Sequence, residues 1–441
     1  MELFDQGTSF YMPAFFKIKL ATALPFEDII GSDYEHDFFH EYLHFLQDVL
    51  TTYGLINMSK VLNCIKHLFH QVKEMQSKGN YILSRPISFT GVTEINDELV
   101  DLYLKYTKTA IIQADVKVCN ITVEKKMPKQ DMQLPVNQYY VTFSNGVSYY
   151  LGAHALLECL CHIVEKKIYN CEKPLQVPYD LPLLVWNYCL EDISHLKDNI
   201  PVLLDVIEYS LQFYDPAEVF FSVINALKTL PASRLKIVSN PYNFLINYCN
   251  TDTDKNANDS YEGALNRVYE DIDGTLTSDI YTPYKHWITQ LLDNSKRFKN
   301  SKEFLFSKLF KMDITEARNY IEYLKKSIGL PPVVNEDGEI FVKGVIGDKK
   351  DKLYLKEIEK MFFIYSQGIL SAYNFLRGFN DGCDKDLREI CLHINNESNY
   401  EIYDVDDKCE SSPWEKYNET NVCPFTAVWK TWGLEKMHIL R

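Results

Sequence analysis

The chain has 441 residues, a formal net charge of −15 at pH 7 and a sequence pI of about 5.3. This acidic balance argues against a nucleic-acid backbone as the main partner, because phosphate binding depends on clustered Lys and Arg. Hydrophobic residues make up 46% of the chain and charged residues 24%. These proportions are typical of a globular protein with a large core and argue against a mainly disordered chain.

The N-terminal residues MELFDQGTSF contain no basic residue and no long apolar run, so no secretory signal is predicted. The longest uncharged stretch, residues 361–376, includes Ser, Gln, Gly and Asn and is a poor membrane span. The 11 cysteines are scattered and include no C-x-x-C pair. We therefore expect a cytoplasmic protein with reduced thiols and no membrane span.

The first predicted elements are a strand at 13–20 and a helix at 33–54. The helix is apolar on almost every side, which is typical of a buried helix. Its polar residues form one stripe, which we expect to face an internal cleft. Ser32 or Asp33 is expected to cap the start of this helix, and Gly54 is expected to end it.

Within this helix lies the pattern H-E-x-x-H, which runs from His40 to His44. Residues four apart lie on the same face of a helix, so the two histidines can offer imidazole nitrogens to one metal ion. Glu41 lies beside that ion, where it can take a proton from a metal-bound water. The motif therefore predicts a zinc-hydrolase centre. The alternative is a pair of surface or core histidines that bind no metal.

The elements that follow are a helix at 55–75, a helix at 96–107, a strand at 114–124 and a hairpin at 139–151. His67 and His70 on the first of these are interpreted as structural rather than metal-ligating. Side chains alternate on both sides of Asn145-Gly146 in the hairpin, and this pair is the preferred one for a two-residue type I′ turn.

A further helix is predicted at 152–169, directly after the hairpin. His154, Glu158 and His162 follow one another at spacings of four and so share one face, with Glu165 close to it. Acidic and histidine side chains on one face of an otherwise apolar helix are what a second ligand helix requires. A solvated polar stripe is the alternative interpretation.

Beyond residue 174 the chain is predicted to be mostly helical. The expected helices are 183–194, 202–214, 216–229, 260–273, 284–298, 302–310 and 314–328, with a later one at 356–379. A short strand is expected at 339–345, and the tail from 382 is rich in turn residues.

A third metal ligand must come from outside H-E-x-x-H, because catalytic zinc usually has three protein ligands. The metzincin class is excluded, since its Gly and His positions are held by Gln47 and Leu50. A glutamate on a later helix is the other solution. In this respect the sequence resembles the gluzincin group of zinc metallopeptidases, through residues 40–44 and, more loosely, Glu158.

The resemblance implies that His40, His44 and Glu158 bind Zn²⁺ and that Glu41 is the general base and acid. The sequence differs from the group in two ways. The separation between the second histidine and the glutamate is longer than in compact gluzincins. In addition, His162 stands where those enzymes often have an Asp that orients a histidine. Glu165, His154 and His162 therefore remain alternatives for the third ligand.

The predicted fold class is α+β and mostly helical. A zincin-like core, with a small sheet and two active-site helices, is expected at 1–170. A helical region that completes the cleft is expected at 171–330, and a C-terminal extension of helix and irregular tail at 331–441.

The implied reaction is hydrolysis of a protein or peptide substrate. Zinc lowers the pKa of its bound water toward about 7. Glu41 accepts the proton of that water and then passes it to the amine that leaves the cleaved peptide bond. Asp48 can orient a ligand from a second layer, although it is equally explained as a helix-surface acid. The candidate donors to the oxyanion are Tyr149, Tyr150, His154, His162 and His195.

Two other functions fit the same residues. A zincin-fold interaction protein that no longer cleaves would keep the metal ligands. A zinc hydrolase of a non-peptide amide needs the same attacking hydroxide as a peptidase, so the motif does not separate the two.

Overall fold

Helices make up most of the described chain, and the sheets are small, in agreement with the predicted α+β class. The computed structural model describes residues 9–342 and parts of 368–440. Within the first range, the longest gaps are 230–256, 128–134 and most of 89–106. None of the helices within these ranges has both the length and the apolar character that crossing a bilayer requires.

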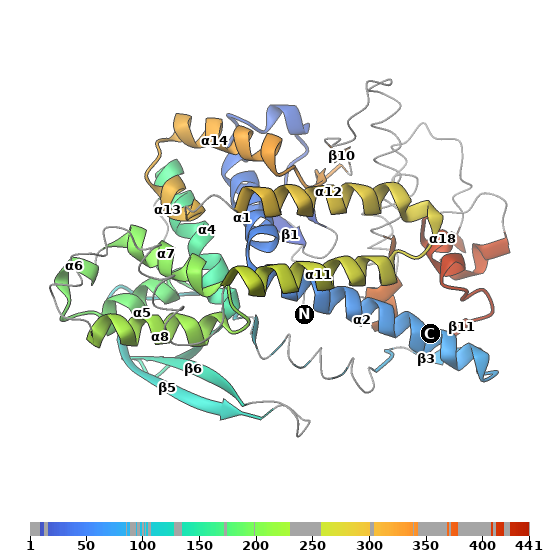
Figure 1. Cartoon of the computed structure of the whole chain (residues 1–441), viewed down its shortest axis with the longest axis horizontal. Helices are drawn as coiled ribbons and strands as arrows, with labels where there is room; N and C mark the ends of the chain where they lie inside the picture. Colours follow the sequence, from blue (N-terminus) through green and yellow to red (C-terminus); the bar gives the residue numbers. More distant parts are fainter. Residues whose placement is uncertain are drawn as a thin grey trace.

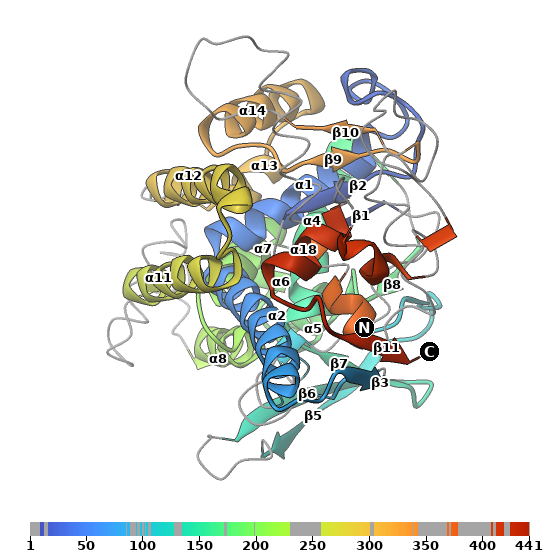
Figure 2. The ribbon, with the colours of Figure 1, turned by 90° about the vertical axis from the view of Figure 1, so that its right-hand side faces the viewer.

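Helix α1 (Glu35–Leu50) lies at the centre of the molecule (Figure 2). It packs against α2 (Thr52–Ser77), α4 (Ala153–Tyr169), α12 (Thr282–Lys299) and the strand β1 (Phe10–Met12). Apolar side chains on opposite sides of α1, such as Leu43 and Phe45, are fully enclosed. The prediction of a buried helix is therefore confirmed.

The start of α1 differs from the prediction. Tyr34 precedes the helix and makes no capping hydrogen bond through its side chain. Instead, the Glu35 carboxylate accepts a hydrogen bond from the Gly31 backbone N–H at 2.7 Å and one from Arg318 Nε at 2.7 Å. The expected cap by Ser32 or Asp33 is therefore wrong: Ser32 Oγ accepts from the Tyr34 N–H at 3.2 Å, before the helix begins, and Arg318 comes from α14 (Ile314–Ser327).

The end of α1 also differs. The helix stops at Leu50, and Thr51 is extended, with φ −116° and ψ 150°. The Thr51 hydroxyl accepts a hydrogen bond from the Gly54 N–H at 3.0 Å and so caps α2. Gly54 thus belongs to the first turn of α2 rather than ending α1. A Cβ at this glycine would lie 2.4 Å from Asp48 Cα, so glycine is required here by close backbone approach.

Gly54→Ala is expected to lower the free energy of unfolding by about 1–3 kcal/mol, because the added methyl group meets backbone atoms that cannot move aside. The matched control is Gly263→Ala in α11 (Ala257–Thr275), where a Cβ meets nothing within 4 Å. That change is expected to stabilise the protein by about 0.5–1 kcal/mol. Urea unfolding of both variants measures the difference, and equal effects would contradict the steric explanation.

Strands from distant parts of the chain pair with one another. The first sheet has the order β1, β2 (Lys17–Lys19), β9 (Val333–Val334), β10 (Ile340–Phe341). In it, β2 pairs in parallel with β9. Near the other end of α2, β3 (Ile82–Ser84) pairs in parallel with β11 (His438–Leu440). Residues of the predicted ranges 1–170 and 331–441 therefore share two sheets, and buried side chains of all three ranges form one core.

The predicted hairpin is present as part of a three-stranded antiparallel sheet, with strands β5 (Val118–Lys126), β6 (Val136–Phe143) and β7 (Ser148–Leu151). The Gly146 N–H donates to the Phe143 carbonyl at 2.8 Å, and the Phe143 N–H donates to the Val147 carbonyl at 2.9 Å. Gly146 has φ +80°, but Asn145 is not among the described residues with positive φ. The two-residue type I′ turn is therefore wrong. The loop has three residues, and only its glycine is left-handed.

Most of the later helices begin and end close to the predicted positions. They are α5 (Leu181–Cys189), α6 (Ser194–Lys197), α7 (Ile200–Ser210), α8 (Pro216–Thr229), α11, α12, α13 (Leu305–Phe310) and α14. The predicted helix at 183–194 ends early, because α5 stops at Cys189 and a separate short helix, α6, begins at Ser194. Figure 1 shows α5 to α8 grouped above the β5–β6 ribbon. The predicted helices at 96–107 and 356–379, and the end of the strand at 339–345, lie largely outside the described residues.

A buried acid on α7 holds the start of α13. The Glu208 carboxylate accepts hydrogen bonds from the backbone N–H groups of Leu305 and Phe306, each at 3.0 Å. Burial raises the pKa of Glu208 from 4.5 to about 7, although these two N–H groups lower it. The folded protein therefore keeps this proton at pH values where the unfolded chain has released it.

Between about pH 4.5 and 7 the unfolded state binds fewer protons at Glu208 than the folded state does, so this group makes stability fall as the pH rises. Glu208→Gln removes this contribution. As the pH rises from about 4.5 to 7, we expect the free energy of unfolding of the variant to gain up to about 3 kcal/mol relative to that of wild type. Thermal unfolding of both proteins from pH 4.5 to 7.5 tests this, and parallel stability curves would contradict it.

Candidate metal centre

Two histidines of α1 and a glutamate of α4 converge on one point. The Nε2 atoms of His40 and His44 lie 3.1 Å apart. Glu158 Oε2 lies 3.5 Å from the first and 3.4 Å from the second. Zinc–ligand bonds of about 2.0–2.2 Å in a tetrahedron place neighbouring ligand atoms about 3.3–3.5 Å apart. These three side chains could therefore hold one metal ion.

The outer nitrogen of each histidine is held by a hydrogen-bond acceptor. His40 Nδ1 lies 3.0 Å from Glu165 Oε2, and His44 Nδ1 lies 2.8 Å from Gln47 Oε1. Gln47 Nε2 donates to the Leu157 carbonyl of α4 at 2.9 Å, which fixes its oxygen toward His44. Since both partners accept, each Nδ1 carries the hydrogen in the neutral ring. Each Nε2 then presents its lone pair to the shared point.

The charges of the cluster keep the glutamate ionised. Burial raises the pKa of Glu158, but the two histidines lower it further, and the net pKa is well below its usual range. Burial lowers the pKa of His40, but hydrogen bonds to Glu158 and Glu165 more than offset this, and its net pKa is well above its usual range. The site therefore attracts positive charge, as a cation site requires.

Glu41 follows the first ligand and is enclosed, with 7% of its surface exposed. Burial raises its pKa, while His40 and His44 lower it through their charge. The side chain thus lies within electrostatic reach of both histidines, in a region that excludes most water.

Among the alternatives for the third ligand, the described residues bring only Glu158 into the cluster. Glu165 contacts the outer nitrogen of His40 instead. His154 Nε2 lies 3.6 Å from the other oxygen of Glu158, and burial lowers the pKa of this histidine, which keeps it neutral. His162 Nε2 lies 3.9 Å from Asp180. The acid that orients the ligand His40 is therefore Glu165. It lies three residues beyond position 162, where gluzincins often have Asp.

The remaining candidates lie in varied surroundings. Asp48 accepts a hydrogen bond from the Tyr11 hydroxyl at 2.9 Å, and burial raises its pKa to about 7. Tyr149 packs edge-on against Phe143, with ring centroids 5.7 Å apart. Tyr150 packs edge-on against Tyr140 at the same distance. His195 lies in α6, and its side chain is outside the described residues.

Three residues beside the ligands were not recognised as neighbours from the sequence: Gln47, Tyr179 and Cys161, whose Sγ lies 3.6 Å from His44 Nδ1. Gln47 lies three positions after His44, and this spacing on one helix face is a signal that could have indicated the contact. Tyr179 has its ring centroid 6.4 Å from that of His40 and 5.2 Å from that of His162. It comes from the turn after β8 (Gln176–Val177), and no sequence pattern connects it to α1.

Comparison of the chain with protein-family models, with curated proteins and with solved structures found no match. The function must therefore be argued from the geometry of the site.

Glu165→Gln is expected to weaken metal binding about 10- to 100-fold, because the neutral amide orients the His40 ring less strongly and adds no negative charge. Competition with a chromophoric chelator measures the affinity. The matched control is Lys167→Gln, an exposed change on the same helix, which should bind metal as wild type does. Equal affinities of the two variants would exclude an orienting role for Glu165.

Proposed function

We propose that this protein is a zinc-dependent peptidase in which His40, His44 and Glu158 bind the metal and Glu41 moves the proton. The observation that carries the proposal is the convergence of three ligand atoms at separations of 3.1, 3.4 and 3.5 Å. The hydrogen bonds that orient both imidazole rings add to this support. The resemblance of the ligand pattern to gluzincins points to the same function.

The chemistry of the donor set favours zinc. Two imidazole nitrogens and one carboxylate oxygen form a ligand set found in catalytic zinc sites, which leave a fourth position open. Calcium and magnesium prefer sites built from oxygen ligands. The described cluster contains no thiolate, the ligand typical of closed structural zinc sites. A hydrolytic centre therefore explains the ligands better than a structural one does.

When bound, zinc supplies Lewis acidity that lowers the pKa of water to about 7 and polarises the carbonyl under attack. Glu41 is the residue that takes the water proton and returns it to the leaving amine. Its buried position serves this role, because a carboxylate with a raised pKa exchanges protons more readily near neutral pH. His154 and Tyr179, which lie beside the ligands, are candidates to hold the substrate carbonyl oxygen.

Glu41→Gln is expected to keep stoichiometric zinc but to lower peptide cleavage about 10²- to 10⁴-fold, because the amide cannot accept the proton. The control is Glu74→Gln, an exposed change on α2, which should leave cleavage unchanged. Turnover of a fluorogenic peptide library and metal content by mass spectrometry provide the two measurements. Cleavage by Glu41→Gln at the wild-type rate would exclude Glu41 as the base.

His40→Ala is expected to lose the zinc that wild type carries, since two ligands cannot replace three in an open site. Equal zinc in both proteins would contradict the proposed centre. Zinc that depends on His40, without cleavage of any peptide, would favour an interaction protein that keeps the metal. Cleavage restricted to non-peptide amides would instead identify an amide hydrolase.

A further inference from the structure

Helices α2 and α11 run side by side, as Figures 1 and 2 show, and a cavity of about 230 Å³ opens between them. The residues that line it do not include His40, His44 or Glu158. Lys60 and Asn63 of α2 line it, together with Arg267 of α11 and Tyr214 of the turn between α7 and α8. Two cations therefore face one cavity.

Lys60 holds its charge among aromatic rings. Its Nζ lies 4.5 Å from the ring centroid of Tyr214 and 5.1 Å from that of Tyr103. In the described part of the chain, no carboxylate lies within ion-pair distance of Lys60. Burial lowers the pKa of Lys60 to about 8, so most molecules carry the charge at pH 7. A partly buried cation without a counter-charge is destabilising, and an anion in the cavity would reduce that effect.

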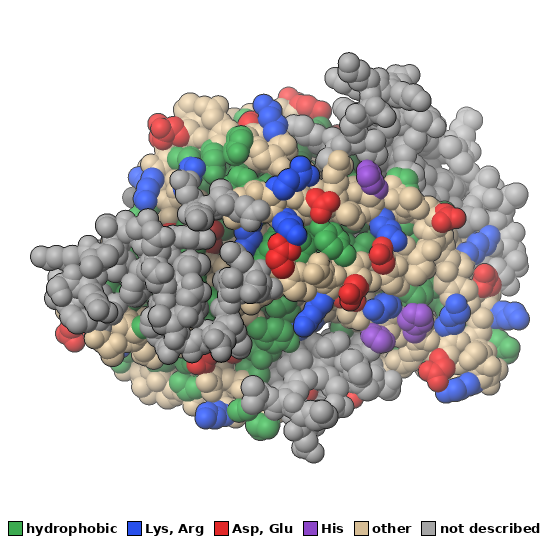
Figure 3. Space-filling view, viewed as in Figure 1, with side chains coloured by type: hydrophobic (Ala, Val, Ile, Leu, Met, Phe, Trp, Pro, Cys, Tyr) green, Lys and Arg blue, Asp and Glu red, His purple; other side chains and the backbone are tan. Residues whose placement is uncertain are grey.

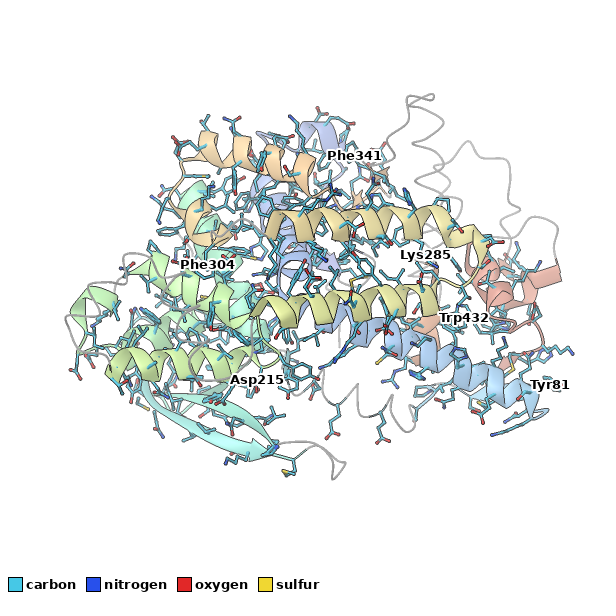
Figure 4. The ribbon with its side chains drawn as sticks, viewed as in Figure 1. Tyr81, Asp215, Lys285, Phe304, Phe341 and Trp432 are labelled. Carbon is cyan, nitrogen blue, oxygen red and sulfur yellow. The ribbon has the colours of Figure 1, made fainter. Side chains whose placement is uncertain are left out.

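Two acids, Glu270 and Asp271, also line the cavity, and Asp215 precedes α8 beside Tyr214; each is held by other donors or faces solvent. Asp271 accepts hydrogen bonds from the Ser59 hydroxyl at 2.6 Å and from Lys66 Nζ at 3.1 Å. Asp215 lies at the start of α8 (Figure 4), where it accepts a hydrogen bond from the Glu218 N–H at 3.1 Å. Glu270 is exposed. None of these carboxylates is an ion-pair partner of Lys60.

Arg267 adds a second positive charge on the same wall. It is exposed, and the described residues include no ion-pair partner for it. Burial raises the pKa of Tyr214, and the Arg267 charge lowers it, so the guanidinium lies within electrostatic reach of the tyrosine that Lys60 faces. Charged side chains of both signs are scattered over α11 and α12 in Figure 3. Attraction of an anion would therefore be local to the cavity rather than the result of a broad basic surface.

We propose that this cavity binds the phosphate or carboxylate group of a small molecule between Lys60 and Arg267, with the Asn63 amide as a further donor. Arg267 offers a planar pair of donors, and Lys60 offers a point charge. The cavity is open to solvent on one side and has room for an acidic group with a short organic part. The proposal does not depend on the metal centre.

The test is the rate of acylation of Lys60, followed by mass spectrometry with and without sodium phosphate, and separately with sodium acetate. An anion within a few ångströms stabilises the protonated amine, so saturating anion is expected to slow acylation of Lys60 about tenfold. Lys73, an exposed lysine of the same helix, should react at an unchanged rate. The His40→Ala protein should show the same protection, which separates this site from anion binding at the metal centre.

Arg267→Gln alters an exposed side chain and should fold normally. It is expected to raise the anion concentration for half-protection of Lys60 about tenfold, and Lys73→Gln should leave that concentration unchanged. Protection by only one of the two anions supports the proposal and identifies the acidic group. The proposal is wrong if neither anion slows acylation of Lys60, or if Arg267→Gln and Lys73→Gln behave alike.

Discussion

The contact between α1 and α4 is the interaction on which the candidate metal centre depends. Two buried helices meet there, and polar side chains face one another across an otherwise apolar interface. Gln47 joins the two helices directly, because its amide nitrogen donates to the Leu157 carbonyl while its oxygen accepts from His44. Glu165 makes a corresponding contact with His40 from α4. The ligand geometry and the packing of these helices are therefore set by the same contacts.

Burying these polar side chains between two helices is unfavourable in free energy, and the structure shows which contacts offset it. Buried polar groups destabilise a fold unless hydrogen bonds or opposite charges satisfy them. Here the two imidazole rings have acceptors on their outer nitrogens, and the carboxylate of Glu158 faces both rings. The apolar sides of α1 supply compensating burial through residues such as Phe38 and Leu46. A metal ion would add a central charge to a network that is already oriented.

Local patterns in the sequence were sufficient to predict most of the helices and the ligand candidates, since hydrophobic period and residue spacing are local properties. Such local patterns do not predict which of two nearby acids on one helix becomes the candidate metal ligand. Glu158 and Glu165 lie seven residues apart on one side of α4, and only the packing of α1 against that helix determines which one faces the shared point and which one faces the outer nitrogen.

Gly54 shows the same limit in the fold. A glycine at the end of a helical pattern usually indicates a helix end, but here it permits a close backbone contact in the first turn of the next helix. The pair Asn145-Gly146 also does not determine the type of turn, because it is compatible with hairpin loops of two or three residues. These outcomes depend on three-dimensional contacts that residue spacing does not encode.

The pairing of early strands with late ones has a consequence for how the protein is made. Strand β2, which packs on α1, pairs with β9 from residues 333–334, and β3 pairs with β11 from residues 438–440. A nascent chain leaves the ribosome from its N-terminus, so α1 is synthesised long before the strand that completes the sheet beside it. Folding of this region is therefore expected to be slow, with the sheet beside α1 incomplete until β9 has been synthesised.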